Sequence, residues 1–181
     1  MSNFLSNLVE VSGNENASSV DKGLVSDIRG FIDTGSYTLN ALLSGSLYGG
    51  IPDNKITALA GEQATGKTFF CFNILKTFLA DNPDGVVLYF DSEQAITSQM
   101  FSERDIDPSR VAVLPVSTIE EFRHQMIQVA DTYRAESDKK PILVILDSLG
   151  NLSTLKEMED TASGKNVRDM TKAQALKATF R

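Results

Sequence analysis

Apolar and polar positions alternate along the chain in blocks that predict a succession of strands and helices. Residues 86–90 (VVLYF) and 142–146 (ILVIL) are continuously apolar, which is typical of strands covered on both faces. Shorter apolar stretches at 24–32, 55–60 and 111–114 predict further strands. Because strand and helix patterns alternate, we expect an α/β fold with an open, mostly parallel sheet.

Apolar residues at helical spacing and helix-capping residues predict the helices. Ser36 marks one helix start, Thr118 with Glu121 three residues later marks another, and the turn sequence at 82–85 (NPDG) marks a helix end. Residues 148–166 lack a clear period, so no regular element is predicted there. The expected helices cover residues 1–10, 36–43, 69–81, 97–103, 118–133 and 167–181.

The N-terminal segment differs in pattern from the rest of the chain. Residues 1–10 carry an apolar stripe at helical spacing, while residues 12–21 (SGNENASSVD) are polar and indicate a flexible tether. A short helix on a tether cannot bury its apolar face against itself, so it is either a frayed terminus or an arm that docks on a neighbour. We divide the chain into an arm of helix, tether and strand, residues 1–32, and a core, residues 33–181.

Composition limits the class of protein without identifying a function. The chain has 181 residues, a formal net charge of −7 and a single cysteine, Cys71. A negative net charge argues against binding nucleic acid by bulk positive charge, so any DNA site must be a local basic patch. One cysteine excludes an internal disulfide framework, and neither a signal-peptide pattern nor a membrane-length apolar run is present. We expect a soluble, cytoplasmic protein without membrane contact.

The most specific motif is GEQATGKT at residues 61–68, which matches the phosphate loop (Walker A) pattern G-x-x-x-x-G-K-[ST] at every fixed position. An apolar strand is predicted before it and an apolar helix after it, as the motif requires. In such a loop, backbone N–H groups and the lysine hold phosphates, and the last hydroxyl holds Mg²⁺. The pattern predicts that a nucleoside triphosphate is bound by Gly61, Glu62, Gln63, Ala64, Thr65, Gly66, Lys67 and Thr68.

Carboxylates follow both of the strongly apolar strands. Asp147 ends the later one, and Asp91 and Glu93 follow the earlier one. Parallel strands end at one edge of a sheet, where ligands bind, so Asp147 is a candidate for a second Mg²⁺-side group beside Thr68. Either Asp91 or Glu93 could orient and deprotonate an attacking water, and spacing alone does not choose between them.

Residues 107–111 (DPSRV), 147–152 (DSLGNL) and 169–173 (DMTKA) resemble the phage branch of the RecA family of recombinases. Three further segments, together with the phosphate loop, resemble the RecA family as a whole. They are residues 34–45 (TGSYTLNALLSG), 89–95 (YFDSEQA) and 144–148 (VILDS). The resemblance runs from about residue 33 to residue 181, and it implies a three-layer P-loop NTPase fold with a RecA-like core. It also implies ATP as the nucleotide, Glu93 as the catalytic carboxylate acting with Lys67, and Asp147 at the Mg²⁺ site.

The same resemblance implies a DNA-dependent ATPase that forms filaments of itself on single-stranded DNA and exchanges strands in recombination and repair. A mediator or single-strand-binding protein is a further implied partner, and the N-terminal arm is implied to dock on the next subunit. The family's first DNA-binding loop falls near residues 159–166, and basic residues continue into the following helix. The implied DNA contacts are Lys165, Asn166, Arg168 and Lys172, for which a solvated charged face is the alternative interpretation.

The resemblance further implies a core truncated at its C-terminal end. The family continues past residue 181 with a strand that lies between the phosphate-loop strand and the strand at 142–146. Two other functions stay open on the same residues. One is a ring helicase or clock-type ATPase, and the other is a non-catalytic regulatory subunit that joins filaments without hydrolysing ATP.

Overall fold

The structure is a computed structural model that describes residues 3–14, 17–24, 26–164 and 171–180. The chain divides into two compact units, Met1–Ile74 and Leu75–Arg181. Helix α3, Lys67–Asp81, begins in the first unit and ends in the second. The part of the chain that the structure describes contains no helix long and apolar enough to cross a membrane.

The first unit consists of short elements joined by loops. Its strands β1 (Phe31–Ile32) and β2 (Ile51–Pro52) pair antiparallel. The helix predicted at 1–10 is confirmed over its described residues, and the helix predicted at 36–43 is confirmed. Ser36 caps the second helix by accepting a hydrogen bond from the Leu39 N–H at 3.4 Å. The helical elements are α1 (Asn3–Val11), η1 (Val20–Lys22), α2 (Tyr37–Ser44) and the start of α3.

Two strand predictions in this unit are wrong. The strand expected at 24–32 is reduced to the two residues of β1, and residues 55–60 form no strand. A strand is defined by the backbone ladder it makes with a neighbour, and no described residue pairs with the backbone of residues 55–60. The apolar sequence of residues 55–60 therefore indicated a tendency to form a strand. Among the described residues they have no neighbouring strand to pair with, so they are not assigned as one.

A buried amide organises the loops around α2. Asn40 is fully buried, and its side-chain oxygen accepts from the Thr34 N–H at 3.0 Å and the Thr34 hydroxyl at 2.7 Å. Its amide nitrogen donates to Asp33 Oδ1 at 2.8 Å and to the Leu47 carbonyl at 3.0 Å. Gly50 (φ +137°) passes so close that a Cβ there would lie 2.0 Å from the Ile32 carbonyl oxygen.

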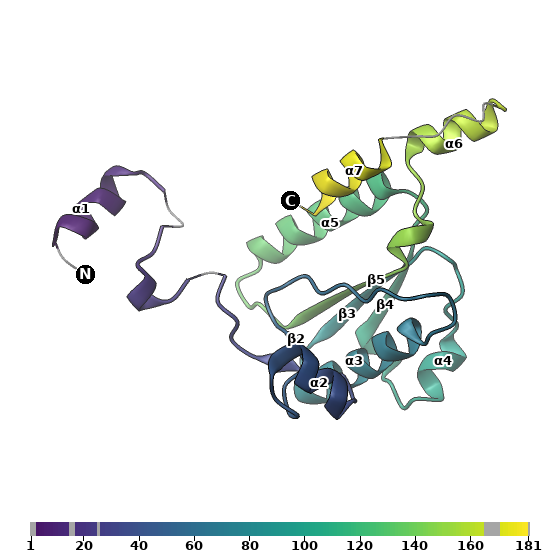
Figure 1. Cartoon of the computed structure of the whole chain (residues 1–181), viewed down its shortest axis with the longest axis horizontal. Helices are drawn as coiled ribbons and strands as arrows, with labels where there is room; N and C mark the ends of the chain where they lie inside the picture. The colour runs from purple at the N-terminus through teal and green to yellow at the C-terminus, as the bar shows by residue number, and fades with distance from the viewer. Residues whose placement is uncertain (1–2, 15–16, 25, 165–170, 181) are drawn as a thin grey trace. The chain divides into compact units, whose positions relative to one another are not determined.

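The second unit is built on a parallel sheet in the order β4–β3–β5 (Figure 1). Strand β3 (Val86–Asp91) lies in the centre, between β4 (Val111–Pro115) and β5 (Ile142–Asp147). This confirms the predicted α/β class, the parallel pairing and the three strands. Among the described residues no strand pairs with the outer edge of β5, so the neighbour implied by the family resemblance is not part of the described sheet.

Helices cover both faces of this sheet. Helices α5 (Ile119–Ala135) and α7 (Lys172–Thr179) lie on one side, and α4 (Ser98–Ser102) with the end of α3 lies on the other (Figure 1). On the α5 side, the Phe90 and Phe122 rings meet edge to face with centroids 4.9 Å apart. The buried core on that side comprises Phe90, Val116, Ile119, Phe122 and Leu152.

The segment between β5 and α7 departs from the prediction. Residues expected to be irregular form the turn η3 (Leu149–Asn151) and the helix α6 (Leu155–Ala162). Helix α6 starts at a full capping box, in which Thr154 and Glu157 each accept the other's backbone N–H. The last described helix, α7, covers Lys172–Thr179, and residues 165–170 and 181, which include both ends of the helix predicted at 167–181, lie outside the described residues.

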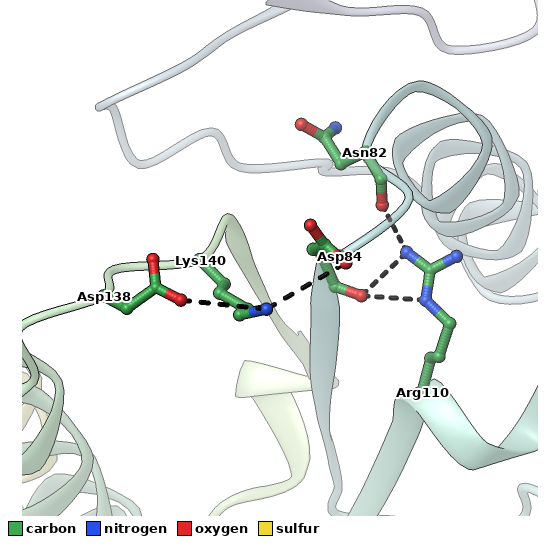
Figure 2. A network of polar contacts seen from close by, with 6 residues as sticks. Asn82, Asp84, Arg110, Asp138 and Lys140 are labelled. Carbon is green, nitrogen blue, oxygen red and sulfur yellow. Dashed lines mark hydrogen bonds and ion pairs between the residues drawn. The ribbon is translucent and has the colours of Figure 1, made fainter.

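Arg110 ties the end of α3 to the start of the sheet. It is the last residue of the short turn η2 (Pro108–Arg110), and its guanidinium donates to the carbonyl oxygens of Asn82 and, at 2.8 and 3.0 Å, of Gly85 (Figure 2). It also donates to the Leu79 carbonyl oxygen at 3.0 Å. Carbonyls at a helix C-terminus lack partners within the helix. One planar side chain therefore satisfies the Leu79 carbonyl in the last turn of α3 and links it to the carbonyls of Asn82 and Gly85 in the turn that follows.

Candidate functional site

The phosphate-loop sequence at residues 61–68 adopts a compact turn closed by its own side chains. Ala64 (φ +62°) and Gly66 (φ +91°) turn the backbone into the left-handed region. Lys67 Nζ donates to the carbonyl oxygens of Gly61 at 3.0 Å and Glu62 at 2.7 Å, and the Thr65 hydroxyl donates to Glu62 at 2.8 Å. The ammonium group thus lies across the loop, with no acidic side chain among these partners.

The loop presents backbone donors that the protein does not use. Within the described residues, the N–H groups of residues 63–67 have no hydrogen-bond acceptor. They lie where α3 begins, and a helix start carries partial positive charge. Successive N–H groups around left-handed residues form a concave anion site. The donors, the helix terminus and the ammonium group of Lys67 together fit the phosphates of a nucleotide.

At the edge of the sheet in the second unit, β3 and β5 end side by side. Asp91 and Asp147 occupy paired positions in the register. Asp91 is 3% exposed, and its two oxygens accept the N–H groups of Glu93 at 3.1 Å and Ile96 at 3.0 Å. Asp147 is half-buried and accepts from the Tyr89 hydroxyl at 2.8 Å. Asp91 therefore shapes the turn after β3, whereas Asp147 is less deeply buried at the end of β5.

Glu93 lies beyond this buried carboxylate and is exposed. Its Oε1 accepts from Asn151 Nδ2 and, at 3.4 Å, from the Ser148 hydroxyl. Ser148 follows β5 through a cis peptide bond and exchanges two 2.8 Å hydrogen bonds with the Ser92 hydroxyl. The turn after β3 and the turn after β5 are thereby joined by polar contacts, and the Glu93 carboxylate is among the groups that make them.

The predicted site residues that the structure describes lie in both units. The loop residues and Lys67 belong to the first unit, while Glu93 and Asp147 share one sheet edge in the second. Lys172 begins α7 and donates to the Gly150 carbonyl at 3.3 Å. Lys165, Asn166 and Arg168, predicted as DNA contacts, lie outside the described residues.

Three residues of this edge were not predicted as part of a site: Tyr89, Ser92 and Asn151. Each contacts a residue more than fifty positions away in the sequence, with separations of 58, 56 and 58. Ser92 and Asn151 lie in the polar tracts that follow the two apolar strands, whereas Tyr89 lies within the apolar run at 86–90. A single sequence does not reveal which members of those tracts meet.

The parallel sheet with covered faces and the phosphate loop define a P-loop nucleotide-binding core of the RecA type. The comparison with known proteins agrees with this class. Over its whole length the chain is similar to the "Recombination and repair protein" of Enterobacteria phage T4, with 32% identity over 181 residues, 100% of this chain and 45% of that protein. The resemblance to the RecA family, and to its phage branch, is confirmed.

More distant relatives carry related names. The chain is 26% identical over 160 residues to "Protein RecA" of Malacoplasma penetrans, covering 82% of this chain and 46% of that protein. It is 28% identical over 129 residues to "DNA repair and recombination protein RadB" of Thermoplasma acidophilum, covering 71% and 53%. The chain therefore spans about half the length of the curated relatives it matches. It matches no family model.

Proposed function

We propose that this chain is the ATP-binding core of a DNA recombinase of the RecA type. The observation that carries the proposal is the loop at residues 61–68, where unused N–H groups and the Lys67 ammonium group occur together at the start of α3. Such a site suits a triphosphate. Similarity over the whole chain to a phage recombination and repair protein supports recombination as the process that uses it.

The loop residues would bind ATP without a rearrangement of the fold. Lys67 Nζ is bonded only to backbone carbonyls of the loop, so it can exchange them for phosphate oxygens without losing an ion pair. Thr68 and Asp147 would hold Mg²⁺ through oxygen atoms, which this ion prefers. Bound Mg²⁺ would neutralise charge on the phosphate oxygens.

Glu93 is the better candidate for the group that orients and deprotonates water. Both oxygens of Asp91 are committed to backbone N–H groups in a buried turn, so protonating that carboxylate would cost the turn its hydrogen bonds. Glu93 is exposed, and its bonds leave one oxygen unused. A general base needs a free lone pair within reach of its proton donor, and this supports the assignment of Glu93 over Asp91.

The proposal extends from ATP binding to activity on DNA. The chain would assemble with copies of itself into filaments on single-stranded DNA and promote homologous pairing and strand exchange, with a mediator or single-strand-binding protein as partner. Lys172, together with Lys165, Asn166 and Arg168, would contact DNA. The arm, residues 1–32, would dock on a neighbouring copy; α1 supports this because it keeps Phe4, Leu8 and Val11 exposed.

The experiment compares Glu93→Gln with Asp91→Asn in the full chain. We expect Glu93→Gln to bind ATP normally and to lose DNA-stimulated hydrolysis by at least roughly 10²-fold, as removal of a general base does. ATP binding is measured with a fluorescent nucleotide and hydrolysis by phosphate release, with and without single-stranded DNA. Wild-type turnover in Glu93→Gln together with loss in Asp91→Asn would reverse the assignment.

Electron microscopy of the Glu93→Gln variant tests the DNA part separately. With ATP bound and hydrolysis blocked, filaments on single-stranded DNA are expected. Closed rings would instead indicate a helicase-type or clock-type ATPase on the same core.

A further inference from the structure

The contact between Asn151 and Glu93 joins a turn after β5 to a turn after β3. Asn151 Nδ2 donates to Glu93 Oε1, the oxygen that also accepts from the Ser148 hydroxyl. Among the described residues, the second oxygen, Oε2, has no hydrogen-bond partner. The carboxylate is therefore held at one oxygen and open at the other.

The turn that carries Asn151 is held in place by its backbone contacts. Its backbone N–H donates to the Ser148 carbonyl at 3.3 Å, and Ser148 is itself bonded twice to Ser92. The carbonyl of the preceding residue, Gly150, accepts from Lys172 Nζ at 3.3 Å. The following residue, Leu152, is fully buried in the core of the second unit. The backbone from which the Asn151 side chain extends is therefore anchored on both sides.

An amide donor at this place suits a carboxylate that must keep one orientation. A glutamate side chain on the surface samples several rotamers, and the free energy of choosing one adds to the barrier of any reaction that needs it. A neutral N–H donor restricts the carboxylate without adding charge and leaves Oε2 able to accept a proton. A lysine or arginine would instead form an ion pair that competes with this task.

We propose that Asn151 is a positioning residue for Glu93, which it orients by hydrogen bonding to Oε1 so that Oε2 faces the attacking water. This inference rests on the proposed role of Glu93 as the group that deprotonates water. Asn151 touches neither nucleotide nor water in this arrangement and acts only through the carboxylate.

The fold does not depend on this contact. Both side chains are exposed, and a single hydrogen bond between exposed groups contributes about 1 kcal/mol or less to stability. Loss of the Asn151 amide should therefore leave folding and nucleotide binding unchanged while slowing turnover. That separation is what distinguishes positioning from a structural role.

The experiment measures steady-state ATP hydrolysis with single-stranded DNA for Asn151→Ala and Asn151→Asp in the full chain. Asn151→Asp is the matched variant, because it keeps the size and shape of the side chain and replaces the donor by an acceptor. We expect both variants to lower kcat about tenfold or more, the effect of a misplaced catalytic group. The KM for ATP and the melting temperature should stay at wild-type values.

A double-mutant cycle with Glu93→Gln identifies the route of the effect. If Asn151 acts through Glu93, Asn151→Ala adds no further loss in the Glu93→Gln background. Equal losses in both backgrounds, or wild-type kcat in Asn151→Asp, would overturn the inference while the role of Glu93 stands. Wild-type turnover in Glu93→Gln would overturn the role of Glu93 and this inference with it.

Discussion

The phosphate loop and the carboxylate edge of the sheet are formed in opposite ways. In the loop, the hydrogen bonds connect residues that are close in sequence, three to six positions apart. At the sheet edge, the bonds from Tyr89 to Asp147 and from Asn151 to Glu93 each span 58 positions. The loop can therefore be recognised from eight consecutive residues, whereas the edge exists only once β3 and β5 have paired.

The two regions differ in which parts of the sequence determine their conformation. A local motif fixes its conformation through the φ preferences of glycine and through short side-chain reach. A non-local site depends on register, since a shift of one residue between β3 and β5 would turn Asp91 and Asp147 to opposite faces. Substitutions in the loop should change ligand binding directly, and substitutions around the sheet should act through geometry or stability.

The largest effect is expected from Lys67→Ala, which breaks the local site. It removes the ammonium group that lies across the loop, and hydrogen bonds to a charged partner are worth about 1.5–3 kcal/mol. Binding of Mg·ATP should weaken roughly hundredfold or more, measured by titration with a fluorescent nucleotide. Lys76→Ala in the same helix is the control, because Lys76 makes only an exposed ion pair to Asp105 at 3.9 Å.

Unchanged affinity in Lys67→Ala would show that the backbone N–H groups alone bind the phosphates. Weakening of similar size in Lys76→Ala would indicate that any positive charge on α3 contributes.

Arg110→Met is expected to have an intermediate effect, on stability rather than on binding chemistry. It leaves the carbonyl oxygens of Leu79, Asn82 and Gly85 without their part-buried charged donor. We expect a loss of about 2–3 kcal/mol in the free energy of unfolding, measured by urea denaturation. Arg110→Lys should recover only part of it, because one ammonium group cannot match the planar fork.

Lys140→Met serves as the comparison in the same region (Figure 2). Lys140 lies 4.0 Å from Asp84 and 3.9 Å from Asp138, and all three side chains are at least half exposed. Its removal should change stability by less than about 1 kcal/mol. Equal losses for Lys140→Met and Arg110→Met would mean that the network acts through net charge instead of through the carbonyl contacts.

The smallest effect is expected from Asp107→Ala, which removes the side chain that caps the short turn η2 in the second unit. Hydrogen bonds from the Ser109 hydroxyl and then from the Ser109 N–H hold the pKa of Asp107 below its usual value. A lowered pKa in the folded state contributes stability that is present above the usual aspartate pKa and is lost as pH falls through the lowered one. Asp107→Ala should therefore be slightly less stable than wild type at neutral pH.

The stability difference between Asp107→Ala and wild type should shrink as the pH is lowered past the usual aspartate value, followed by urea midpoints across that range. A difference that grows on acidification would contradict the assigned direction of the pKa shift.

The sequence predicted well those elements whose signal is continuous and local. The apolar runs at 86–90 and 142–146 became β3 and β5, and Ser36 and Thr118 cap α2 and α5 as predicted. Thr118 accepts the Glu121 N–H at 3.1 Å, although the Glu121 carboxylate accepts from Ser117 instead of from Thr118. Helix α6 was missed because residues 155–162 are too short and too polar for a period to stand out.

By itself, the sequence determined that residues 61–68 match the phosphate-loop pattern, that strands and helices alternate, and that carboxylates end two buried strands. Only the tertiary structure decided that residues 55–60 form no strand among the described residues, since a ladder needs a partner. It also distinguished Asp91, whose oxygens bind buried backbone N–H groups, from Glu93, which meets Asn151 at the surface. Local backbone preferences are readable along a chain, but contacts between distant residues follow from strand pairing and register, which no single segment encodes.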